Sequence, residues 1–71
     1  MIEHTFQYDD IIRVTADAPK EARPGEIGWI VGIYDDRSRF PLEEFEEGTV
    51  YLIEFEDGQD ALVHERHLKN S

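Results

Sequence analysis

The chain contains no cysteine, and this absence excludes several kinds of protein. Without cysteine there is no disulfide framework, no thiolate nucleophile and no zinc site built on cysteine ligands. Long apolar runs are also missing, because no stretch approaches the ~18 residues that a membrane-spanning helix needs. The first ten residues, MIEHTFQYDD, lack the basic and apolar regions of a secretory signal peptide. We therefore expect a cytoplasmic protein that does not cross a membrane.

Positive charge is scarce, with seven Lys and Arg against seventeen Asp and Glu and a formal net charge of −10 at pH 7. Binding of nucleic acid depends on clustered Lys and Arg, so we expect no direct contact with it. A length of 71 residues suits a single small domain. Hydrophobic residues make up 39 %, which is enough for one compact core but not for a core around a large cofactor. We expect no cofactor.

Short segments rich in β-branched and aromatic residues predict an all-β fold. Tyr51, Ile53 and Phe55 share one face of their segment, while Glu54 and Glu56 lie on the other, which predicts a strand with one buried face. Asp57-Gly58 follows at once and is typical of a tight hairpin turn, while Gly28 and Gly32 inside an apolar run indicate a bulge or a bend. The expected strands span residues 10–16, 26–34, 49–56 and 60–64, with an irregular loop at 17–25 and a helical turn at 65–68. We expect residues 1–8 to form an edge strand or to be flexible.

Three segments together resemble the small SH3-like barrels: PGEIGWIVGIY at 24–34, YLIEFEDG at 51–58 and VHERHL at 63–68. The chain is most similar to small bacterial domains of unknown function with this core, and more distantly to Tudor- and KOW-type barrels. The resemblance covers about residues 10–68, and it implies a single five-stranded SH3-like barrel. KOW-type relatives bind RNA or ribosomal partners through basic loops, which this chain lacks. Tudor-type relatives bind methylated Lys or Arg in an aromatic cage, for which the rings here would be Trp29, Tyr34, Phe40 and Tyr51.

Residues 35–48 (DDRSRFPLEEFEEG) predict an acidic insertion between the second and third strands, where the relatives have a short connection. The segment is too long for a tight hairpin and too polar for a strand. One interpretation is a loop whose Phe40, Leu42 and Phe45 cover an open end of the barrel. The other is an insertion that carries the binding site, because long loops in compact domains are often functional.

The distribution of charge is the main functional signal. No Lys or Arg occurs between Arg39 and Arg66, an interval that contains nine acids. These carboxylates are either a solvated face that keeps the protein soluble or a negative field that attracts a basic partner. Because like charges at this density reduce stability, we favour the second interpretation. The residues expected to bind the partner are Trp29, Phe40, Glu43, Glu44, Phe45, Glu46 and Glu47, with Asp57 and Asp60 as the second edge of the patch.

Catalysis is not expected, and no catalytic residue is assigned. The acids lie in exposed runs without the apolar setting that shifts a pKa, and there is no glycine-rich phosphate loop. His64 and His67 would lie close together on a helical turn, but a third metal ligand is not evident, so we expect surface histidines and no metal.

The sequence therefore favours a non-catalytic module that neutralises a basic protein, in the manner of an immunity protein or antitoxin bound to a toxin such as a nuclease. The alternative is an accessory or regulatory SH3-like domain or subunit of a larger enzyme assembly.

Overall fold

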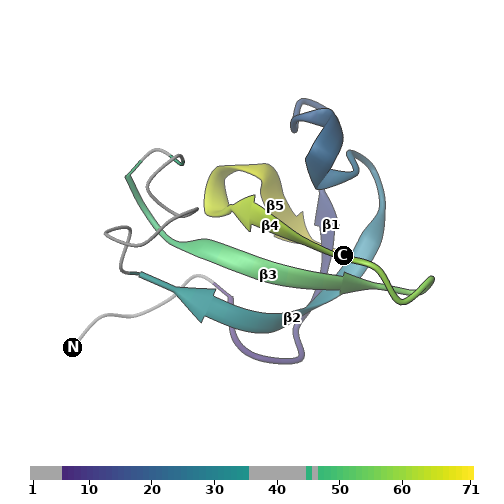
Figure 1. Ribbon diagram of the computed structural model, residues 1–71, viewed down its shortest axis with the longest axis horizontal. Helices are drawn as coiled ribbons and strands as arrows, with labels where there is room; N and C mark the ends of the chain where they lie inside the picture. The colour runs from purple at the N-terminus through teal and green to yellow at the C-terminus, as the bar shows by residue number, and fades with distance from the viewer. Residues whose placement is uncertain (1–5, 36–44, 46) are drawn as a thin grey trace.

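The computed structural model describes residues 6–35, 45 and 47–71, and in these ranges the fold is all-β (Figure 1). One antiparallel sheet of five strands has the order β4-β3-β2-β1-β5, which confirms the predicted all-β class and the number of strands. The fifth strand, Leu68–Asn70, was not predicted and follows the expected helical turn. Two 3-10 turns, η1 (Lys20–Ala22) and η3 (Glu65–His67), are the helical elements of this part of the chain. No helix in it has the length and apolar character needed to cross a membrane. The strands are β1 Ile11–Val14, β2 Ile27–Tyr34, β3 Val50–Phe55, β4 Asp60–His64 and β5 Leu68–Asn70.

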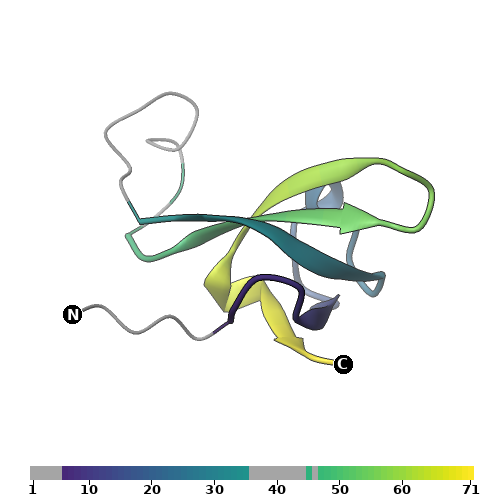
Figure 2. The same cartoon turned by 90° about the horizontal axis from the view of Figure 1, so that it is seen from below.

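The sheet is strongly curved but is not closed by strand pairing. In Figure 1, β2 and β3 run side by side as long curved ribbons, and in Figure 2 β5 lies apart from the β3–β4 hairpin. β4 and β5 are the two edges of the sheet, and the chain passes from one to the other through η3. The register of β2 against β3 shifts between Ile30 and Gly32. This irregularity confirms the predicted bulge and increases the local bend of the strand.

The core lies on the concave side of this sheet. Tyr51, Ile53 and Phe55 on β3 are all buried there, as the alternation of the sequence predicted. The other four strands and the loop that contains η1 contribute to the same cluster. Its members there are Ile12 and Val14 on β1, Ile30 on β2, Val63 on β4, Leu68 at the start of β5, and Ala18 and Ala22 from the loop. The predicted hairpin is also present, because Gly58 has a positive φ of 85° between β3 and β4.

Gly28 allows the central strands to pack closely. It pairs with Ile12 on β1 and with Phe55 on β3. A Cβ atom at this position would lie 2.5 Å from the carbonyl oxygen of Glu54 and 2.7 Å from Cγ2 of Ile53. Glycine is therefore required here by the close approach of the neighbouring strand.

The N-terminal segment contributes to the core from residue 6 onward. Phe6 is only 3 % exposed and packs edge-to-face on Tyr51, with ring centroids 5.5 Å apart. Its backbone N–H donates to the Tyr51 hydroxyl at 3.2 Å. Residues 6–10 are not a strand, but the N–H of Asp9 donates to the carbonyl of Ile30 at 2.9 Å. The described part of the segment is thus attached to β2, whereas residues 1–5 lie outside the described ranges.

Candidate protein-binding face

A row of four residues crosses the convex side of the sheet, which we call the outer face. Ile11 on β1 pairs with Trp29 on β2, Trp29 pairs with Glu54 on β3, and Glu54 pairs with Asp60 on β4. Residues directly opposite each other in antiparallel strands project from the same side of the sheet. Trp29 and Glu54 are half-buried, Asp60 is exposed and Ile11 is 53 % exposed. The fold therefore places an indole, an aliphatic side chain and two carboxylates in one line, which we call the outer row.

Apolar side chains extend around the outer row. Ile27, Val31 and Tyr34 on β2 are exposed, and Leu52 and Leu62 form a half-buried pair on β3 and β4. Isolated apolar residues are common on protein surfaces, whereas a contiguous group indicates a binding surface. The outer face thus combines an apolar centre with charged residues.

Charge is divided unevenly over the outer face. Arg13 on β1 and Lys69 on β5 are paired in register and lie next to Ile27, on the β1–β5 side. Arg13 is engaged, because its Nη1 donates to the carbonyl of Gly25 at 2.8 Å. Acids occupy the β3–β4 side, where Glu54 lies opposite Asp60. The two halves of the face therefore present opposite charge to a partner.

The Glu54–Asp60 pair is unfavourable within this chain. Two carboxylates directly opposite each other on neighbouring strands repel. Neither makes an ion pair with any residue that the structure describes. Among the residues that the structure describes, this like-charge pair therefore has no counter-ion, and it lies beside Trp29.

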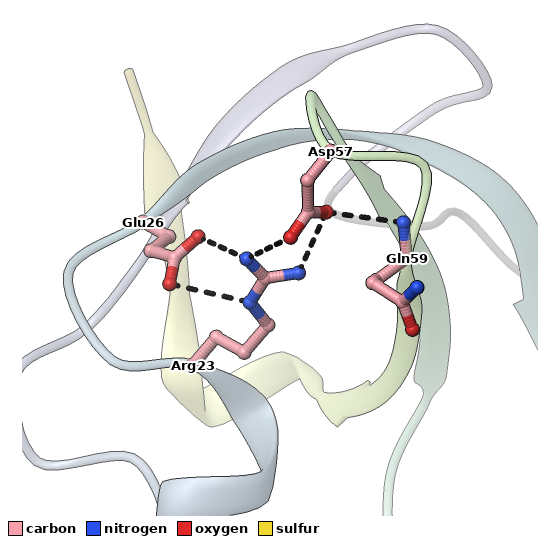
Figure 3. A network of polar contacts seen from close by, with 4 residues as sticks. All are labelled: Arg23, Glu26, Asp57 and Gln59. Carbon is pink, nitrogen blue, oxygen red and sulfur yellow. Dashed lines mark hydrogen bonds and ion pairs between the residues drawn. The ribbon is translucent and has the colours of Figure 1, made fainter.

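Asp57 has a different environment, because it is bound by an arginine of the same chain (Figure 3). Arg23 Nη1 and Nη2 donate to the two carboxylate oxygens of Asp57 at 3.0 and 2.8 Å, and its Nε donates to Glu26 at 3.2 Å. The guanidinium carbon lies 4.4 Å from the centroid of the Phe55 ring. Asp57 also accepts the backbone N–H of Gln59 at 3.0 Å. This residue, expected in the partner-binding patch, is thus occupied by an internal ion pair.

The same contacts shift the pKa values of Asp57 and Arg23. The hydrogen bonds from Arg23, followed by that from the Gln59 N–H, hold the pKa of the Asp57 carboxyl below its usual value of 3.8. The carboxylates of Asp57 and Glu26 raise the pKa of the Arg23 guanidinium. Arg23 has φ 62°, an uncommon left-handed conformation for a residue with a side chain. The ion pair therefore links the end of η1 to the β3–β4 hairpin.

Asp57→Asn is expected to destabilise the protein at neutral pH and to matter less as the pH falls. Because the pKa of Asp57 is lowered in the folded state, its contribution is fully present above the usual pKa of 3.8 and is lost as the pH falls through the lowered value. Thermal unfolding of both proteins between about pH 7 and about pH 2 measures this effect. The two melting curves should converge in acid. A difference that stays constant over the whole range would contradict the role of the ion pair.

His64 and His67 lie at the corner between β4 and η3, and neither is the exposed surface histidine that the sequence predicted. His64 is buried, and its Nδ1 accepts the backbone N–H of Arg66 at 3.1 Å. Its Nε2 then carries the proton and donates to the carbonyl of Glu47 at 2.9 Å. His67 Nδ1 is buried without a hydrogen-bond partner among the described residues, and it lies 3.7 Å from a carboxylate oxygen of Asp17. In the described part of the chain, no three His, Asp or Glu side chains are grouped as a metal site would require.

Glu47 and Phe45, both expected to bind the partner, lie near this corner. Phe45 is half-buried and lines a cavity of about 260 Å³ with Pro19, Ala22, Leu62 and His64. The cavity lies between the loop of η1 and the β4–η3 corner, and Leu62 belongs both to its lining and to the outer face. Four other expected residues fall outside the described ranges: Phe40, Glu43, Glu44 and Glu46.

Of the expected partner-binding residues, Trp29 and Asp60 lie in the same row of the sheet, and the residue between them is Glu54. Sequence reasoning missed Glu54 and Ile11 as candidates. The alternation of β3 correctly assigned Glu54 to the solvent side, but its position opposite Trp29 depends on the strand register.

Comparison of the chain with protein-family models, with curated proteins and with solved structures found no match.

Proposed function

We propose that this protein is a non-catalytic, acidic protein-binding module whose partner is a basic protein. The observation that carries the proposal is the outer row. Trp29 lies beside Glu54 there, and neither Glu54 nor Asp60 has a counter-ion among the described residues. Aromatic anchors and complementary charge are the features that specific protein interfaces use. With a net charge of −10, association with a basic surface would also be steered electrostatically.

The mechanism would be occlusion of the partner's functional surface without chemistry. In its most concrete form the protein is a cytoplasmic immunity protein or antitoxin that covers the basic, phosphate-binding cleft of a toxin such as a nuclease. We extend the proposal to the fold: an SH3-like barrel with an acidic insertion at residues 35–48, between β2 and β3. Support for this comes from the strand order β4-β3-β2-β1-β5 and from the 3-10 turn before β5.

The second candidate is an accessory or regulatory domain or subunit of a larger enzyme assembly. The exposed aliphatic side chains of Ile11, Ile27 and Val31 favour it, because a stable assembly buries more apolar surface than an electrostatic inhibitor does. Its complex would therefore depend less on salt concentration.

Capture of the partner from the native host, with parallel washes at low and high salt, distinguishes the two candidates. The captured protein is then purified, and its association rate is measured against wild type and a variant with Glu43, Glu44, Glu46 and Glu47 reversed to Lys. For a basic partner we expect association about tenfold slower or more at low salt. Circular dichroism verifies that the variant is folded.

Unchanged association kinetics would remove the insertion from the binding site. A stoichiometric complex with enzyme subunits that is indifferent to salt would overturn the inhibitor proposal in favour of the accessory one.

A further inference from the structure

The contacts of Arg23 are an internal example of how this fold binds a cation. One guanidinium packs over the ring of Phe55 and at the same time forms a bidentate ion pair with Asp57. A planar guanidinium is suited to this double contact, because its face stacks on an aromatic ring while its edge donates to a carboxylate.

The outer row repeats this combination without the cation. Trp29 lies directly opposite Glu54, and side chains in such positions have Cβ atoms ~5 Å apart. Indole is the aromatic ring that binds cations best. Arg23 is occupied by Asp57, and Arg13 donates to the Gly25 carbonyl. In the described part of the chain, the ring and its carboxylates therefore have no arginine or lysine on them.

The pairing of Glu54 with Asp60 indicates which kind of cation would suit this face. They repel each other across the β3–β4 pair, and a single cation placed between them would contact both. The five N–H donors of a guanidinium can reach two carboxylates while its face remains on an indole, whereas a lysine ammonium is a point charge without a stacking face.

We propose that the outer row binds an arginine side chain of the basic partner, stacked on Trp29 and paired with Glu54 and Asp60. Aliphatic side chains of the partner on either side of this arginine would pack on Ile11 and Ile27, which are exposed near Trp29. A second copy of this chain is disfavoured as the occupant, because two molecules of net charge −10 repel. This inference rests on the proposed function and specifies the chemistry of its interface.

A peptide titration tests the inference directly, because Trp29 is the only tryptophan and its indole N–H gives a single NMR signal. The probe is the capped peptide Gly-Ile-Arg-Ile-Gly, compared with peptides that have lysine or uncharged citrulline instead of arginine. We expect the arginine peptide to shift the Trp29 indole signal and the amide signals of Glu54 and Asp60. Binding should be about threefold weaker with lysine and should be lost with citrulline. An arginine peptide that leaves the Trp29 signal unchanged overturns the inference.

Glu54→Gln and Asp60→Asn should change stability and binding in opposite directions. Removing one charge of the repelling pair should raise the melting temperature by about 1–5 °C, while the arginine peptide should bind about threefold more weakly. Glu21→Gln is the matched control, because it removes one exposed negative charge on η1. If Glu54→Gln and Asp60→Asn weaken binding no more than the control, the inference is wrong.

The same variants separate this inference from the proposed function. In one outcome, Glu54→Gln and Asp60→Asn bind the full basic partner as wild type does, while the variant with the four lysines in the insertion does not. The proposed function then stands and the arginine site is wrong. If wild type itself shows no salt-sensitive association with a basic protein, the proposed function fails.

Discussion

Phe6→Ala is expected to lower the free energy of unfolding by about 3–4 kcal/mol, in the range found when a buried phenylalanine is truncated. Phe6 is 3 % exposed and its ring packs edge-to-face on Tyr51, which is completely buried. The substitution removes this aromatic contact and leaves a cavity beside the Tyr51 ring. Because small domains are stable by only ~5–15 kcal/mol, the loss is a large part of the total stability and moves unfolding to a clearly lower urea concentration. Urea denaturation followed by circular dichroism measures it.

Tyr8→Ala is the control for this experiment, since Tyr8 lies two residues further along the same segment and is 59 % exposed. We expect its effect to stay within about 0.5 kcal/mol. Equal losses for the two variants would show that the segment contributes through its backbone and not through the burial of Phe6.

Gly28→Ala is the second change with a large expected effect, a loss of about 2–3 kcal/mol. The added Cβ would meet the backbone oxygen of Glu54 at 2.5 Å, and backbone atoms cannot move aside as the end of a flexible side chain can. The substitution therefore forces β2 and β3 apart at the point where Phe55 enters the core. Thermal and urea unfolding of the purified variant test this prediction.

Gly32→Ala provides a matched comparison on the same strand. A Cβ at Gly32 would meet mainly the end of the Tyr34 side chain, at 2.9 Å, together with Cβ of Leu52 at 3.0 Å. Because the Tyr34 ring can rotate away, we expect a smaller loss than at Gly28. A larger loss at Gly32 would mean that the bulge between Ile30 and Gly32, and not the close approach at Gly28, limits the packing of the sheet.

The sequence was sufficient for four of the five strands and for the side of β3 that is buried, but it did not predict β5 at Leu68–Asn70. Alternation with a period of two is a local property, so Tyr51, Ile53 and Phe55 indicated their common face without knowledge of their neighbours. Turn chemistry is equally local, and Asp57-Gly58 predicted the hairpin that the structure contains. The strand limits differ from the predicted ranges by one or two residues at most for β1, β2 and β3, and those of β4 agree.

The candidate site was only partly predictable. Trp29 and Asp60 were selected for their residue types, and the fold places both in the outer row. Asp57 was selected on the same grounds, but it is paired with Arg23, which is 34 residues away in the sequence. Nothing local distinguishes a carboxylate that is free to bind a partner from one that is already bound by its own chain.

By itself, the sequence determined the net charge, the strands β1 to β4 and the inner face of β3, because composition and alternation belong to the chain itself. The three residues of β5 show no such alternation, and only their pairing with β1 makes them a strand. The tertiary structure decided that Phe6 enters the core and that Ile11, Trp29, Glu54 and Asp60 form one row. The physical reason is strand register: a shift of one residue moves every side chain of a strand to the opposite face. Register is set by the packing of the whole core, including the bulge in β2 and the close approach at Gly28, and it therefore exists only once the strands have come together.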